Sequence, residues 1–307
     1  MPRPARPDVP ALPSRGRWGG GAVLPYSLPS MGDLDVGRNA AAAGDWTAAG
    51  HAFVRAAMDG SEEGAELAMG VTGELARLAD AGSADAAALL AGILLEYADE
   101  SALPAAVARA RAAAEAGHPA GQRTYGHLLA SGLGVPEDLD GAERLFRAAA
   151  EAGDPYAALN LGRLSDDVDE SLALLRTAAQ QGIDVAGAVL ADRLSSLDRD
   201  EEALHWYVWA AERGHTGAMN AAACWYRDGF GTAPDPVQAV RWFLAMLAYG
   251  NGDGVHEAIG LVRGGALDEE GVRTAGRLAG DPAAAGSLLP FLPRVLSAED
   301  VSGPGQE

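Results

Sequence analysis

Apolar residues recur at a helical spacing along most of this chain. Alanine, leucine or tyrosine occupies positions i, i+4 and, in most copies, i+8 in four successive segments, which places these side chains on one face of an α-helix. The four sets are Ala86, Leu90 and Leu94; Ala157 and Leu161; Ala186, Leu190 and Leu194; Ala218, Ala222 and Tyr226. The pattern predicts amphipathic helices whose apolar faces pack inward.

Regularly placed glycines divide the chain into segments of helix-pair length. They are Gly82, Gly117, Gly153, Gly182, Gly214 and Gly250, about 29 to 36 residues apart. Residues 118–153 and 215–250 agree nearly position by position. Such self-similarity predicts a stack of repeated helix pairs.

Small and large residues alternate between the two helices of each segment. The first helix carries a small residue at Gly126, Gly162, Ala191 and Ala223, which predicts a close approach of the second helix. The second helix carries small residues at Ala142, Ser171, Ala203 and Ala239, each followed three positions later by a large residue. These large residues, expected in the core, are Leu145, Leu174, Trp206 and Trp242.

Helix starts are marked by aspartates. The turns GLGVPED and GFGTAPD lead into Asp138 and Asp235, which are expected as N-caps, and Asp154 and Asp281 each precede a proline. Aspartate at the N-cap followed by proline at the first helical position is a strong start signal. His118 and His215 share one position after a closing glycine, which favours a turn role for both.

Composition narrows the fold and the chemistry. Hydrophobic residues make up 48% of the chain and aromatic residues only 6%, with three isoleucines and seven threonines. Few residues therefore favour strands, and an all-α fold is expected. The chain has no lysine, which excludes lysine-dependent phosphate loops, Schiff-base enzymes and the kinase site.

Charge and cysteine content indicate the setting. The net charge of -20 is spread along the chain, so nucleic-acid binding is not expected. One cysteine, Cys224, cannot form an intramolecular disulfide, and neither a secretion signal nor a membrane span is evident. These features favour a cytoplasmic protein, and the missing lysines suggest a bacterial source of high GC content.

The repeated pattern resembles the Sel-1-like repeat, a relative of the tetratricopeptide repeat. It is near complete at 118–153 and 215–250 and degenerate at 83–117, 154–182 and 183–214. The resemblance implies a right-handed α-α superhelix, that is, a solenoid of antiparallel helix pairs. It also implies a noncatalytic scaffold or adaptor that binds an unknown protein or peptide on its concave face.

The expected organisation has three parts. Residues 1–30 are rich in proline and predict disorder, residues 31–296 form the repeat domain, and residues 297–307 form a disordered tail. Units are expected to end near residues 60, 82, 117, 153, 182, 214 and 250, with a helical cap at 255–296.

Two surfaces are candidate partner-binding sites. By the resemblance, first helices line the groove, and their non-core positions carry Arg123, His127, Asn160, Arg163, Asn220 and Arg227. Arginine can hold a carboxylate by two hydrogen bonds, and asparagine can bind an extended backbone.

The second surface depends on aromatic residues, half of which lie between Trp206 and Tyr249. Tyr207, Trp209 and Trp225 fall outside the repeat's aromatic positions, so if exposed they form a patch typical of interfaces. A regulatory subunit that docks on an enzyme through this patch is the alternative function. An all-helical hydrolase that stacks a sugar on Trp209 and Trp225 is a third hypothesis, although no carboxylate pair stands out.

No metal, cofactor or catalytic residue is expected. The histidines have no neighbour at metal-binding spacing, and the acidic runs at 166–170 and 198–202 lack the central glycine of a calcium loop. Both acidic runs lie where a second helix begins, a position that the helix dipole favours for acids.

Overall fold

The computed structural model describes residues 31–293, in which seventeen α-helices follow one another without a β-strand. The helices are α1 (Met31–Ala42), α2 (Trp46–Met58), α3 (Glu62–Gly70), α4 (Thr72–Asp80), α5 (Ala84–Tyr97), α6 (Leu103–Glu115), α7 (Pro119–Ser131), α8 (Leu139–Glu151), α9 (Pro155–Leu164), α10 (Val168–Gln180), α11 (Asp184–Ser196), α12 (Asp200–Ala211), α13 (Thr216–Asp228), α14 (Pro236–Ala245), α15 (Val255–Arg263), α16 (Glu269–Ala279) and α17 (Pro282–Gly286). The all-α prediction is confirmed. The segments 1–30 and 297–307, for which disorder is predicted, lie outside the described residues.

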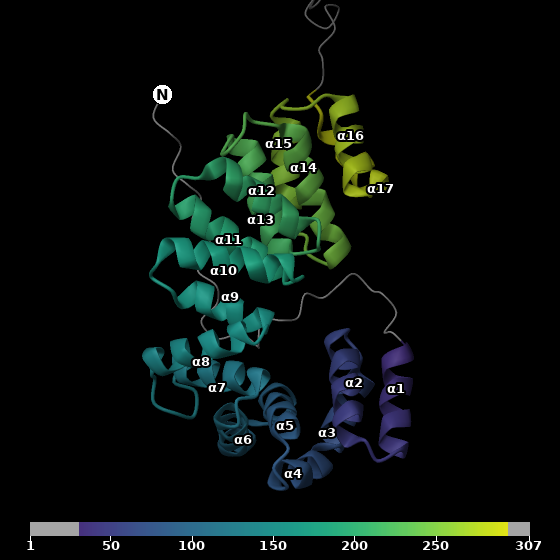
Figure 1. Cartoon of the computed structure of the whole chain (residues 1–307). Coiled ribbons are helices and arrows are strands. Elements are labelled where there is room, and N and C mark those ends of the chain that lie inside the picture. The colour runs from purple at the N-terminus through teal and green to yellow at the C-terminus, as the bar shows by residue number, and fades with distance from the viewer. Residues whose placement is uncertain (1–30, 294–307) are drawn as a thin grey trace, which may run out of the picture. The chain divides into compact units, whose positions relative to one another are not determined.

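The described chain forms two compact units that divide between Ser196 and Leu197. The N-terminal unit contains α1–α11 and the C-terminal unit contains α12–α17 (Figure 1). Helices that follow one another in the sequence pack together, as in the pairs α5 with α6, α7 with α8, α9 with α10, and α13 with α14. The prediction of stacked helix pairs is confirmed, but the division falls inside the predicted unit 183–214.

Each predicted unit-closing glycine has the left-handed backbone that ends a helix. The six φ angles are positive, at Gly82, Gly117, Gly153, Gly182, Gly214 and Gly250. The residue after the glycine ends one helix and begins the next. At the second junction of known cap chemistry, the Asp154 N–H donates to the Ala149 carbonyl at 3.0 Å, and its carboxylate accepts from the Ala157 N–H at 2.9 Å. Asp138 and Asp235 cap α8 and α14 as predicted.

The two equivalent histidines occupy the same kind of junction. The backbone N–H groups of His118 and His215 donate to the carbonyls of Ala113 and Ala210 at 3.0 and 3.1 Å. His215 also caps α13, because its Nδ1 accepts from the Ala218 N–H at 3.0 Å. The predicted turn role is confirmed for both, although the His118 side chain makes no cap hydrogen bond.

The large core residue of each second helix lies one position later than predicted. Trp206 is half-buried, and so are Leu145 and Leu174; of the predicted set, only Trp242 is buried. The residues four positions after the small one are all buried, namely Phe146, Leu175, Tyr207 and Phe243. The reason is geometric, because residues at i and i+4 point in more similar directions than the sequence rule of three assumes.

Small residues of first helices face these large residues, as predicted. A Cβ atom added at Gly126 would lie 2.9 Å from Phe146 Cε1, and one added at Gly162 would lie 2.9 Å from Leu175 Cγ. The small residue therefore lets α8 approach α7, and α10 approach α9. This packing fixes which residues of α7 and α9 remain on the opposite face.

Candidate partner-binding surface

The six predicted groove residues are divided between the units. Four lie on α7 and α9 of the N-terminal unit and two on α13 of the C-terminal unit. In chain order they are Arg123, His127, Asn160, Arg163, Asn220 and Arg227.

Basic side chains of α7 and α9 lie close together in the N-terminal unit. Burial lowers the pKa of the His127 imidazole, and the positive charges of Arg123 and Arg163 lower it further. Burial acts first because an imidazolium loses more hydration than a neutral imidazole does. His127 is therefore neutral at pH 7 and lies within electrostatic reach of an arginine on its own helix and of one on the next first helix.

Arg123 and Arg163 differ in how their guanidinium groups are used. Arg123 Nε donates to Asp154 Oδ2 at 2.9 Å, where the two side chains are 24% and 10% exposed, and its guanidinium lies 5.4 Å from the Tyr156 ring. Arg123 thus joins α7 to the first turn of α9. Arg163 forms no hydrogen bond or ion pair within residues 31–293.

Arg163 lies on a recessed surface. The residue is exposed, yet desolvation by the surrounding protein lowers the pKa of its guanidinium, and the charge of Asp192 partly opposes this effect. Exposure together with desolvation is expected of a group in a hollow that remains open to solvent. Arg163 lines a cleft of about 330 Å³ between α9, α10 and α11, together with Asp192 and Arg193.

Sequence reasoning missed Arg193 and Asp192. The signal was present, because Ala191 holds the small position of its repeat and Asp192 is therefore equivalent to His127 and Arg163. The degenerate unit 183–214, however, lacks the wide glycine turn, and its first helix supplied no candidate.

The C-terminal unit uses its candidate arginine internally. Arg227 donates to both carboxylate oxygens of Asp228, at 2.7 and 2.8 Å, and to Glu257 at 2.7 Å. The Asp228 hydrogen bonds raise the pKa of the Arg227 guanidinium. Asn220 is exposed and has no hydrogen-bond partner in the described part of the chain. Arg227 therefore braces α13 against α15, and its donors are largely occupied.

The predicted aromatic patch is wrong for two of its three residues. Tyr207 and Trp225 are each only 2% exposed, and their rings stack edge to face at 5.1 Å. Tyr207 occupies the large core position described above, which explains its burial. Trp209 remains half-buried beside Trp206, at 5.4 Å, and Arg213 lies over its ring at 3.9 Å. A sugar cannot stack on Trp225, so the proposed carbohydrate platform is absent there.

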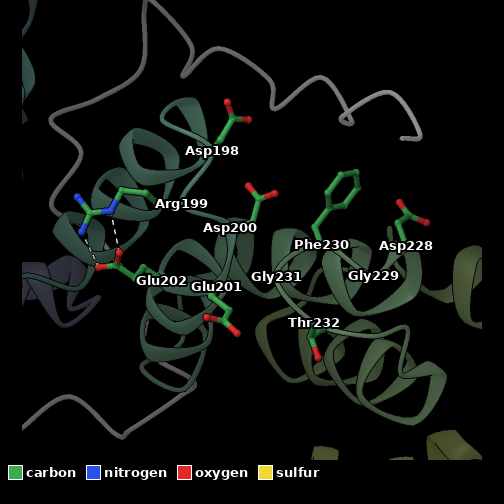
Figure 2. Close-up of a pocket in the computed structure, with 10 residues that line it drawn as sticks. All are labelled: Asp198, Arg199, Asp200, Glu201, Glu202, Asp228, Gly229, Phe230, Gly231 and Thr232. Carbon is green, nitrogen blue, oxygen red and sulfur yellow. Dashed lines mark hydrogen bonds and ion pairs between the residues drawn. The ribbon is translucent and has the colours of Figure 1, made fainter. Parts of the chain in front are cut away.

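A second cleft, of about 540 Å³, lies in the C-terminal unit and is mainly acidic. Figure 2 shows the carboxylates of Asp198, Asp200 and Asp228 on the same side as the Phe230 ring, whereas Arg199 is turned away and bonded to Glu202. Across residues 31–293, no group of three or more His, Cys, Asp or Glu side chains is arranged to hold a metal ion.

Consecutive helix pairs closed by left-handed glycines define an α-helical repeat protein. The sequence model of the Sel1 repeat matches residues 119–154, 196–215 and 216–246, so the chain contains Sel1 repeats. This agrees with the resemblance found from the sequence. No protein with a curated description matches the chain.

Two solved structures show the same fold. One is a protective antigen present in uropathogenic Escherichia coli strains that displays an SLR fold, with 21% identity and a TM-score of 0.60 over 89% of this chain. The chain spans 65% of the length of that antigen. The other is a Sel1 repeat protein from Oxalobacter formigenes, with 22% identity and a TM-score of 0.51 over 63% of this chain and 83% of its own length. Within the described residues, no helix has both the length and the apolar character needed to cross a membrane.

Proposed function

We propose that this chain is a noncatalytic scaffold that binds a protein or peptide partner through the first helices of its N-terminal unit. The carrying observation is Arg163, an arginine without an ion pair among the described residues of a chain whose net charge is -20. His127 and Asn160 lie on the same two first helices, and Asn160 is likewise without a hydrogen-bond partner in residues 31–293. Helical repeats commonly present such extended surfaces to partners.

Electrostatics supports this assignment over the C-terminal unit. Most arginines of the chain are neutralised locally, as Arg227 is by Asp228 and Glu257. An arginine left without a partner on a recessed, partly desolvated surface is available for a charge-assisted hydrogen bond, which is stronger than one between neutral groups. The partner surface is therefore expected to carry hydrogen-bond acceptors.

The test compares partner capture by two double variants of the full chain in extracts of the native host. Arg163→Ala with His127→Ala is expected to lose the specific partners that the unaltered chain retains. Arg144→Ala with Arg176→Ala is the matched control, because these arginines lie on the second helices α8 and α10 and also lack ion pairs in the described range. Equal capture by both variants would remove the assignment.

A further inference from the structure

The cleft between α9, α10 and α11 of the N-terminal unit has the size of a small binding site. Its volume is about 330 Å³, near the lower limit for small-molecule sites in proteins. Arg163 and Arg193 line it from α9 and α11, and Leu175 and Val189 contribute apolar surface. A cleft of this size accepts one terminal residue of a chain and not a large ligand.

Both arginines of the cleft lack an internal anion. Neither guanidinium forms a hydrogen bond or an ion pair to any part of the chain that the structure describes. The Arg193 Nε atom is in addition buried, with no acceptor there. A buried donor without an acceptor is costly, and an anion in the cleft would supply one. Elsewhere, comparable arginines are paired, as Arg147 is with Glu170 at 2.5 Å.

The charge of the cleft selects a monoanion. Two arginines against Asp192 leave a net of one positive charge, and Asp192 acts directly on the Arg163 pKa. A carboxylate matches this balance, whereas a phosphate dianion would be repelled by Asp192 and by the acidic chain as a whole. Planar guanidinium groups also fit the planar geometry of a carboxylate.

The apolar lining decides which carboxylate fits. Leu175 is only 1% exposed and lies with Val189 in the cleft that the arginines line. A C-terminal aliphatic residue carries its carboxylate and its apolar side chain on the same Cα atom. An internal aspartate or glutamate ends in the carboxylate and offers no apolar group beside it.

From these observations we infer that the cleft binds the C-terminal carboxylate of a partner chain whose last residue is aliphatic, with Arg163 and Arg193 holding the carboxylate. The inference rests on the proposed function, since it names the group by which a partner engages the same face. It adds Arg193 to the binding surface and assigns Leu175 and Val189 the contact with the terminal side chain.

The test uses the full chain, labelled with ¹⁵N, and N-acetyl-L-leucine as the probe. Saturable shifts of the Nε–Hε signals of Arg163 and Arg193 are expected, with the signals assigned from Arg163→Gln and Arg193→Gln. Each of these variants should weaken binding about tenfold or more, because each removes a charge-assisted contact. Arg176→Gln is the matched control and should bind as the unaltered chain does. Circular dichroism checks that every variant is folded.

Three further probes identify the group that is recognised. N-acetyl-L-leucinamide lacks the carboxylate and should bind at least about tenfold more weakly. N-acetyl-L-glutamic acid α-amide keeps only a side-chain carboxylate and should also bind more weakly. Binding of this probe, or of inorganic phosphate, as tightly as that of N-acetyl-L-leucine would overturn the inference, as would the absence of saturable shifts at Arg193.

The two proposals fail in different ways. Partner capture that depends on Arg163 and His127, without probe binding at Arg193, removes the C-terminal carboxylate and leaves the scaffold. Probe binding without any effect of Arg163 on partner capture removes the proposed use of this face for partners and leaves a carboxylate site.

Discussion

Replacing Gly121 by alanine tests how closely α6 and α7 approach each other. A Cβ atom at Gly121 would overlap the side chain of Ala113 and lie 2.8 Å from its carbonyl carbon and 2.9 Å from the Ala114 nitrogen. These atoms belong largely to the backbone of α6, so the overlap is relieved only by separating the helices. Gly92, in α5, is the matched control, because a Cβ there would meet no atom within 4 Å.

The two substitutions should change the free energy of unfolding in opposite directions. Alanine within a helix stabilises by about 0.5–1 kcal/mol relative to glycine, which is the expected gain for Gly92→Ala. At Gly121 the same gain is opposed by overpacking of about 1–3 kcal/mol. Contact with backbone favours the upper half of that range, so Gly121→Ala is expected to lose about 1–2 kcal/mol.

Urea unfolding followed by far-UV circular dichroism measures both values. Adding Ala113→Gly to Gly121→Ala should recover part of the loss, since it removes the overlapping methyl group. The double-mutant cycle then gives the coupling between the two positions directly. Equal stabilisation by Gly121→Ala and Gly92→Ala would refute the close approach of α6 and α7.

Two other substitutions test the electrostatics of α7 and α9. Because burial and two arginines lower the pKa of His127, the unfolded chain takes up a proton below about pH 6.5 more readily than the folded chain does. The stability of the unaltered chain should therefore fall more between about pH 7 and pH 5 than that of His127→Gln; parallel urea midpoints would contradict this. Asp154→Ala removes both the cap of α9 and the Arg123 ion pair, so it should cost about 1–3 kcal/mol. Asp281→Ala, which loses a cap alone, should cost about 1 kcal/mol, and equal midpoints for these two variants would show that the ion pair contributes nothing.

Local sequence signals were sufficient to predict the helices and their order. The spacing of Ala86, Leu90 and Leu94 places three side chains on one helical face. Asp138 and Asp235 mark helix starts because their carboxylates can satisfy free N–H groups of the first turn. Such signals act over a few residues, and packing between distant segments does not alter them.

The register of the core was not available from the same signals. Trp206 and Tyr207 are adjacent and both aromatic, so composition does not distinguish which faces inward. The choice is made by contacts with Trp225 and Phe230 on a later helix and its turn. For the same reason Trp225 was assigned to an exposed patch although it is buried.

The binding surface could be predicted only where the repeat is regular. His127 and Arg163 follow a recognisable small residue, whereas Arg193 lies in a degenerate copy. Pairing also decided which arginines are available. The ion pairs of Arg123 with Asp154 and of Arg227 with Glu257 join residues about 30 positions apart, and no local pattern announces them.

The shared residue at each helix junction has a consequence for how the chain can change its length. Removing residues 118–153 would connect Gly117 directly to Asp154, which already follows a glycine of the same backbone conformation. The new joint would again hold a left-handed glycine followed by a capping residue. Whole helix pairs can thus be gained or lost by duplication or excision without inventing a new connection.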